Sequence, residues 1–383
     1  MPVRNLSTHL THGHECPCHD AKHELSRKVT LRPRQRKGAL SIIEPISRFL
    51  FPRTMPAPVQ QFQVDAAQAG AAIGAALRQW HAGMTWSQAK DLIRNRRVLV
   101  NGVVCLDEGR RLQPGEQVSV ATQRQDAPPT RNDLTIRYLD RQVVVVEKPA
   151  GMRTIFHSSE RHHSRERQAL QPTVQGLLPE LIARREQGKK DDKRRKSGGP
   201  LPAIKVVHRI DRDTSGLLVF ARTEPAFERL AEAFKQHTVD RVYLTVVPGQ
   251  VEAQTFDSEL VDDRGDGRRG STTLKGTGKR AITHVTPIEK LDGYTVLQCR
   301  LETGRTHQIR IHLSEAGHPV CGDARYHQPL YAPPIIDRSG APRLALHAMR
   351  LGFEHPTTGN RLNFEMPLPE DLTRWLDRLR GRK

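Results

Sequence analysis

The stretch VVHRIDRDTSGLLVFAR, Val206 to Arg222, is the part of the sequence that decides the fold. It places one carboxylate, Asp211, between two arginines and then forms a turn at residues 213–216. An apolar run of strand length follows at residues 217–221. Such a segment has two interpretations: a surface ion pair that leads into a core strand, or a reactive acid held rigidly at the mouth of that strand.

The composition limits the class of protein. The 383 residues are enough for two domains and a substantial core. Lys and Arg number 61 against 42 Asp and Glu, and this net charge of +19 indicates a polyanionic partner. Nucleic acid is the default partner, and an acidic membrane surface is the alternative. No apolar stretch reaches the roughly 20 residues that span a bilayer and no secretory signal is recognisable, so we expect a cytoplasmic protein without membrane association.

Residues 1–66 are rich in His, Arg, Pro and Ser without a sustained apolar period, so we expect a disordered basic extension. Soft-metal ligand types cluster within it: His12, His14, Cys16, Cys18, His19 and His23. The spacing C-x-C-H lacks the second pair of a zinc finger, so metal binding is the less favoured interpretation. Alternatively, translation starts at Met55 and the preceding residues are dispensable. The five cysteines of the chain are few and scattered, which favours reduced thiols.

Residues 67–122 have the pattern of a compact α/β unit. Apolar spacing predicts helices at 71–80 and 86–94, Asn-Gly within 98–104 predicts a hairpin, and residues 112–120 follow with a Pro114-Gly115 turn. Four cations cluster just before the hairpin: Lys90, Arg94, Arg96 and Arg97. They favour contacts with nucleic-acid phosphates, whereas the alternative is a packing module whose charges are merely solvated.

A polar linker at residues 123–133 precedes a larger domain at 134–383. Alternation and helical spacing predict two strands and a helix, at 134–138, 143–146 and 173–184. A charged insertion at about 184–200 follows the helix. It is either a disordered surface loop or an arm that wraps RNA and becomes ordered on binding, and the residues leave both open.

Later segments carry further candidate side chains. A predicted helix at 227–234 leads to a predicted strand at 241–247, where Tyr243 taken alone would indicate core packing. The segment G-R-T-H-Q-I-R-I-H spans residues 304–312. Strands and turns that complete a sheet, and a closing helix, are expected at 317–323, 344–348, 353–356, 364–369 and 372–379.

Four of these segments together resemble the RluA-type RNA pseudouridine synthases. The opening stretch is similar to H-R-L-D-x-x-T-S-G-L-L, with Ile210 in place of Leu. The loop E-K-P-A-G-M resembles the family's Lys-Pro-x-Gly loop, so Lys148 is expected to support the active-site wall rather than contact phosphate. R-V-Y-L-T resembles K-x-Y-x-A, and residues 304–312 resemble G-R-T-H-Q-I-R-x-H.

The resemblance implies that Asp211 is the catalytic residue, Tyr243 the active-site aromatic and Arg310 the partner of Asp211. A guanidinium stays charged and can hold a carboxylate bidentately, which keeps the acid ionised. The Tyr243 ring can stack on a flipped uracil, and its hydroxyl can relay a proton. Leu346 is expected to form an apolar wall against the base. Whether Asp211 acts as nucleophile or base is left open.

Further residues are candidates for RNA contact or for orienting these three side chains. Arg209 is expected to fill the space that the flipped base vacates, and both Arg209 and Arg305 to contact RNA. His307, Gln308 and His312 are expected to be orienting or structural residues. A His-x4-His pair without a third ligand does not indicate a metal site.

The resemblance implies an RNA pseudouridine synthase with an N-terminal S4-type RNA-binding domain, to which residues 67–122 are similar. The expected fold class is α+β, with a central, largely antiparallel mixed sheet preceded by the small S4-like domain. Moving the glycosidic bond from N1 to C5 of uracil involves no redox or phosphoryl step, so no cofactor is expected.

Structured RNA is the expected substrate of a monomeric enzyme, with large-subunit rRNA favoured and tRNA as the alternative. A non-catalytic RNA-binding ribosome-assembly factor on the same fold is a second alternative. Loss of the carboxylate would mark it, and Asp211, Tyr243 and Arg310 are all present. A DNA-binding protein would rest on charge alone, without a helix-turn-helix or finger pattern.

Overall fold

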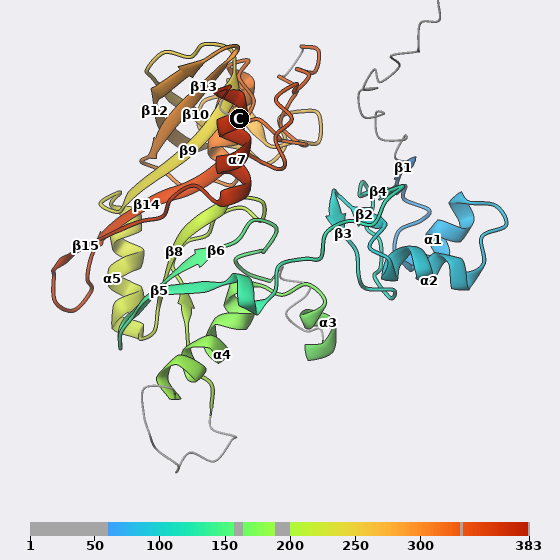
Figure 1. Ribbon diagram of the computed structural model, residues 1–383, viewed down its shortest axis with the longest axis horizontal. Coiled ribbons are helices and arrows are strands. Elements are labelled where there is room, and N and C mark those ends of the chain that lie inside the picture. Colours follow the sequence, from blue (N-terminus) through green and yellow to red (C-terminus); the bar gives the residue numbers. More distant parts are fainter. Residues whose placement is uncertain (1–59, 157–163, 188–199, 330–331, 382–383) are drawn as a thin grey trace, which may run out of the picture. The chain divides into compact units, whose positions relative to one another are not determined.

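The computed structural model describes residues 60–156, 164–187, 200–329 and 332–381 (Figure 1). The His/Cys cluster, the alternative start and most of the charged insertion lie outside these residues, so their predictions stay untested. Within the described part, no helix combines the length and apolar character needed to cross a bilayer. The described cysteines are buried free thiols: Cys105, Cys299 and Cys321.

The first part of the described chain is a small α/β unit whose four antiparallel strands lie in the order β1-β4-β2-β3. Its elements are β1 (Gln60–Gln63), α1 (Ile73–Trp80), α2 (Trp86–Arg94), β2 (Val98–Val100), β3 (Val103–Val104) and β4 (Gln117–Val120). Both predicted helices and the hairpin are present, and β4 follows the turn at Pro114 and Gly115, where Gly115 has a φ of 78°. The unit begins earlier than expected, because β1 pairs with β4 and Val64 is buried.

Local sequence accounts for these elements. Thr85 caps α2 in a reciprocal capping box with Gln88, which satisfies amide groups that the first helical turn leaves free. Asn101 and Gly102 adopt left-handed φ values of 52° and 73°, which a two-residue hairpin turn requires. The apolar faces of both helices are buried in one core with the sheet.

An eleven-stranded sheet forms the second part, in the order β11-β10-β12-β13-β9-β14-β8-β6-β5, with β15 paired to β14 and β7 to β8 (Figure 1). The one parallel pairing is that of β14 with β8, which confirms the predicted α+β class with a largely antiparallel mixed sheet. The strands are β5 (Thr135–Leu139), β6 (Val143–Lys148), β7 (Lys205–Val206), β8 (Ser215–Ala221), β9 (Asp240–Pro248), β10 (Gln254–Val261), β11 (Gly270–Thr272), β12 (Lys279–Leu291), β13 (Tyr294–Leu301), β14 (Leu346–Glu354) and β15 (Arg361–Glu365).

Strands β6 and β8 are covered on both faces, which explains their unbroken apolar sequences. Val144 and Val146 belong to the large core with α4 (Val174–Gln187), whereas Val143 and Val145 belong to a second core with α5 (Glu224–Lys235). Because side chains alternate along a strand, both sets are buried only where other elements cover each face.

Three further α-helices and a short 3-10 helix at Arg131–Asp133 complete the described structure. The α-helices are α3 (Arg165–Ala169), α6 (Gln308–Glu315) and α7 (Glu370–Leu379). The segment at 304–312 therefore ends in a helix, to which the sequence analysis assigned no element. Residues 317–323, expected among the strands and turns of the sheet, form no strand. Asp323 in this segment instead accepts the backbone amides of Arg325 and Tyr326, which fixes an irregular turn.

Gly216 explains why the opening motif requires glycine at the start of β8. Its φ of 128° lies in a region that other residues rarely adopt, and a Cβ there would overlap the backbone of Ala348 on β14. The parallel pairing of β8 with β14 brings the two backbones together at this point. The turn that carries Asp211 thus leads directly into the middle of the sheet.

Candidate active site

A cavity of about 720 Å3 lies over the middle strands of the large sheet, with Leu301 of β13, Tyr243 of β9 and Leu346 of β14 in its wall. Six residues singled out in the sequence line it together: Arg209, Asp211, Tyr243, Arg305, Arg310 and Leu346. A cavity of this size is in the range that takes a whole small-molecule ligand. The structure therefore brings the expected catalytic and pocket residues into one site.

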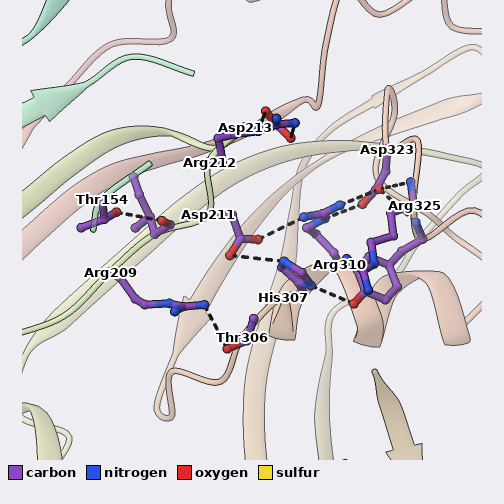
Figure 2. Close-up of polar contacts among 12 residues, drawn as sticks. Thr154, Arg209, Asp211, Arg212, Asp213, Thr306, His307, Arg310, Asp323 and Arg325 are labelled. Carbon is purple, nitrogen blue, oxygen red and sulfur yellow. Dashed lines mark hydrogen bonds and ion pairs between the residues drawn. The ribbon is translucent and has the colours of Figure 1, made fainter. Parts of the chain in front are cut away.

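Asp211 points into this cavity from the turn before β8 (Figure 2). Its Oδ2 accepts from Nη1 of Arg310 at 3.3 Å, and its Oδ1 lies 4.0 Å from Nε2 of His307. The neighbouring Arg212 and Asp213 pair with each other through two contacts of 2.9 Å and point away from it (Figure 2). Asp211 is thus the acid of the turn that remains available to a ligand.

Arg310 holds its bidentate contact with Asp323, not with Asp211. Nε donates to Oδ2 of Asp323 at 2.6 Å and Nη2 to Oδ1 at 2.8 Å, which leaves Nη1 for Asp211 (Figure 2). Burial alone would lower the pKa of Arg310, but the bonds and charge of Asp323, with Asp211, raise it above its usual value. The predicted pairing of Arg310 with Asp211 is confirmed, and the predicted bidentate geometry was wrong because a second, buried carboxylate occupies the fork.

His307 forms the third side of the site. Its φ of 60° is left-handed, which is uncommon for a residue with a side chain, and it immediately precedes α6. Its Nδ1 shares a hydrogen bond of 2.8 Å with the hydroxyl of Tyr326. Burial lowers the pKa of His307 to about 4, so the ring beside Asp211 is neutral at physiological pH. The expectation of an orienting role fits this geometry.

The loop at residues 148–154 holds the backbone on both sides of Asp211. Thr154 Oγ1 donates to the carbonyl oxygen of Ile210 at 2.9 Å, and the carbonyl of Arg212 accepts from Gly151 N and from Lys148 Nζ, each at 2.8 Å. Lys148 is fully buried and also donates to the carbonyls of Pro149 and Met152. Its predicted structural role is confirmed, because a buried ammonium bound to three carbonyls cannot reach a phosphate.

Tyr243 and Leu346 provide the apolar side of the cavity. Both are buried, and their strands, β9 and β14, are neighbours in the sheet. Burial raises the pKa of Tyr243 to about 12, so its phenol carries its proton at physiological pH. A planar ring next to an aliphatic side chain is suited to contact with both an aromatic face and an edge of a heterocycle.

The predicted RNA-binding cations occupy different environments. Arg209 and Arg305 are exposed at the cavity, and Arg209 donates to Thr306 at 3.3 Å (Figure 2). In the small unit, Lys90 and Arg94 are exposed and share Glu108, at 3.8 and 2.7 Å.

The other two cations of the small unit are less available. Arg97 is half-buried and donates to the carbonyl of Ala121, and Arg96 is half-buried with a left-handed φ. A phosphate would therefore meet Lys90 and Arg94 first.

The His-x4-His pair does not form a metal site. His307 bonds to Tyr326, whereas the two ring nitrogens of His312 contact Thr283 and Ser258 at 2.9 and 3.0 Å. In the described residues, no group of three His, Cys, Asp or Glu side chains is arranged to hold a metal ion.

Comparison with known proteins agrees with this site. The sequence model of the family described as RNA pseudouridylate synthase matches residues 142–315, and that of the S4 domain matches residues 79–118. An uncharacterized RNA pseudouridine synthase of Bacillus subtilis, YlyB, is 37% identical over 303 residues, which cover 77% of this chain and 90% of the relative. The chain belongs to the RNA pseudouridine synthase family.

Two further relatives are named ribosomal large subunit pseudouridine synthase D. The one from Xanthomonas campestris is 33% identical over 335 residues, covering 84% of this chain and 93% of the relative. The one from Neisseria meningitidis is 35% identical over 282 residues, covering 70% and 67%. This RNA pseudouridine synthase thus has an S4 domain before its catalytic domain, as the sequence indicated.

A pseudouridine synthase breaks the bond between ribose C1' and N1 of uracil and joins C1' to C5 of the same base. The cavity supplies an acid, Asp211, a protonated phenol, Tyr243, and a neutral imidazole, His307, around one space. A carboxyl group, a phenol and an imidazole around one space can between them donate and accept hydrogen bonds in a reaction in which a proton must leave C5 and another must reach N1.

Proposed function

We propose that this enzyme isomerises uridines in large-subunit rRNA, and that Asp211 is the essential catalytic residue. The observation that carries this proposal is the position of Asp211, which is the one carboxylate among the described residues that line the cavity. Arg310 contacts its side chain, and the loop at residues 148–154 fixes the backbone on both sides of it. Such preorganisation is what an acid acting on a reacting bond needs.

The target uridine leaves its stack to reach Asp211, because the cavity admits a base but not a duplex. This extrusion costs a few kcal/mol, which contacts in the cavity offset. In our proposal, Tyr243 stacks on the flipped uracil and Leu346 packs against it. Arg209, exposed at the cavity, fills the space that the base leaves in the RNA.

Two features support rRNA as the substrate. Relatives at 33 and 35% identity carry the name ribosomal large subunit pseudouridine synthase, and an S4 domain precedes the catalytic domain. Transfer RNA is the alternative substrate class. We further propose that the enzyme acts as a monomer. We place it in the cytoplasm because two relatives are named for the ribosomal large subunit.

Tritium release from RNA labelled at C5 of uridine tests this proposal, because the C5 hydrogen must leave when the glycosidic bond moves there. Large-subunit rRNA and tRNA transcripts are offered separately to the wild-type enzyme and to D211N. We expect release from the rRNA transcript with wild type and none with D211N, although the variant still binds RNA.

The alternatives predict other outcomes. Release from tRNA alone would reassign the substrate class. If the wild-type enzyme binds rRNA without releasing tritium from either RNA, the protein is instead a ribosome-assembly factor on the same fold. Equal release by D211N and wild type would remove Asp211 from the chemistry.

A further inference from the structure

Arg241 is a buried guanidinium that pairs with no carboxylate of the described residues. It lies on β9, is 7% exposed and lines the cavity. Its Nη2 donates to the carbonyl oxygen of Glu302 at 2.6 Å, whereas its Nε is buried without a hydrogen-bond partner in the described part of the chain. No Asp or Glu among the described residues forms an ion pair with it.

The contrast with Arg310 shows what is missing. A buried charge destabilises a fold unless a counter-charge and hydrogen bonds replace the lost water. Arg310 has two carboxylates, Asp323 and Asp211, within hydrogen-bond distance. Arg241 has one neutral carbonyl as its hydrogen-bond partner in the described part of the chain, so an anion that enters the cavity could supply the missing counter-charge.

The surroundings of Arg241 hold its guanidinium in place. The ring of Phe234 lies 5.5 Å from the guanidinium carbon, and the ring of His208 stacks on Phe234 at 4.5 Å. Burial lowers the pKa of His208 to about 3, so this second ring is neutral. A Cβ at position 304 would lie 2.6 Å from Nη1, so Gly304 leaves the room that the guanidinium occupies. Arg241 is therefore fixed by packing, unlike a mobile surface arginine.

The rest of the cavity adds positive charge and little negative charge. Its cations are Arg209, Lys235, Arg241, Arg305 and Arg310, and Asp211 is the one acid among its described lining residues. Asp211 already faces Arg310, and Lys235 is 3.5 Å from Glu232 on its own helix. An anion is thus the ligand chemistry that the Arg241 side of the cavity favours.

We propose that Arg241 binds a backbone phosphate of the RNA next to the uridine that enters the cavity, an inference that rests on the proposed function. Tyr243 lies two residues further along β9, so both side chains project from one face of the sheet, about 6.5 Å apart along the strand. A phosphate joined to the ribose of a base stacked on Tyr243 is within reach of the guanidinium. With Nη2 bonded to Glu302 and Nε buried, Nη1 is the guanidinium nitrogen that remains to donate to a phosphate oxygen.

Two substitutions test this role. R241M removes the charge at similar volume, and R241K keeps a cation without the fork. The dissociation constant for the large-subunit rRNA transcript is measured across a series of KCl concentrations for wild type and both variants. R374Q, which removes an exposed cation from α7, is the matched control for the loss of one surface charge.

We expect R241M to bind roughly ten- to hundredfold more weakly, the effect of one charge-assisted contact. The slope of log affinity against log salt should become shallower by about 0.7 to 0.9, as for the loss of one phosphate contact. R241K should keep most of that slope, and R374Q should match wild type. Free R241M should melt no lower than wild type, because an uncompensated buried charge has been removed.

Equal salt slopes for R241M and wild type would overturn this role for Arg241. The role would also be overturned if R241M melted at a much lower temperature than wild type and R241K bound RNA as weakly as R241M. That combination is expected of a residue that only packs. Tritium release by wild type is scored separately. If wild type released no tritium but R241M still had a shallower salt slope than wild type, the result would contradict the proposed reaction and still support the phosphate contact.

Discussion

Asp323 determines how firmly Arg310 is held, and D323N should therefore impair both stability and activity. The side chain of Asp323 is fully buried, and its oxygens accept Nε and Nη2 of Arg310 at 2.6 and 2.8 Å. Oδ1 also accepts the amides of Arg325 and Tyr326 at 2.9 and 3.0 Å. An asparagine has one acceptor oxygen, so its amide group would face a donor of Arg310 or of the turn.

The magnitude follows from burial. Removing one charge of a buried ion pair costs about 3 to 5 kcal/mol when the other charge is left without a partner. This range is an upper bound for D323N, because Arg310 would keep the longer contact with Asp211 at 3.3 Å. Arg310 would also lose the anchor that aims Nη1 at Asp211, and a misplacement of this kind lowers a rate roughly a hundredfold. D323N should therefore unfold at lower urea concentration and release tritium about a hundredfold more slowly in single turnover.

D371N is the matched control. Asp371 holds Arg343 with the same two-bond geometry, at 2.6 and 3.0 Å, but its side chain is 42% exposed. Water screens this pair, so its loss should cost at most about 1 kcal/mol and leave tritium release unchanged. If D323N loses no more stability than D371N, or keeps the wild-type rate, Asp323 does not position Arg310 as described here.

Three other substitutions have defined outcomes. Burial lowers the pKa of Lys148 from 10.5 to about 7, so folding releases a proton between pH 7 and 10.5. The stability of wild type relative to K148M should therefore rise with pH across this window. Parallel curves of melting temperature against pH for the two proteins would contradict this. The phenol of Tyr243, whose pKa burial raises to about 12, stays protonated. Y243F should therefore lower the single-turnover rate at least about a hundredfold by a factor that does not vary with pH, and a pH-dependent factor would count against a neutral phenol. G216A should lower the free energy of unfolding in urea by about 3 kcal/mol or more, because its Cβ would overlap the backbone of Ala348. G293A, whose Cβ would meet open space at a φ of 71°, should lower it by about 1 to 2 kcal/mol. Equal losses would show that the close approach of Gly216 to Ala348 has no effect.

The sequence predicted those parts of the structure that depend on local pattern. Helix α2 begins and ends where its periodicity indicated, and the Asn-Gly hairpin formed because that dipeptide tolerates left-handed φ. The signature segments also identified Asp211, Tyr243 and Arg310, which meet in one cavity. That these three side chains lie in one site was implied by the family resemblance, because their separation along the sequence does not predict it.

What was missed depends on contacts between distant residues or on uniform burial. Helix α6 is buried on all sides from Gln308 to Ser314, and its polar residues alternate with apolar ones, so the sequence shows no amphipathic stripe of helical period. Asp323 lies in a segment expected to form strands and turns, and only the folded chain shows that it takes the fork of Arg310. An Asp that follows a Gly in a turn gives no sequence signal of burial.

The place of β14 in the sheet has a consequence for how the enzyme is made. This strand lies between β9 and β8, pairing Leu346 with Thr245 on one side and His347 with Ser215 on the other. Asp211 lies on the β8 side of β14, and Tyr243 lies on its β9 side. A ribosome delivers residues 346–354 long after both, and pairings between distant segments form slowly. The nascent chain is therefore without an assembled catalytic centre until this strand has been made and has inserted between β9 and β8.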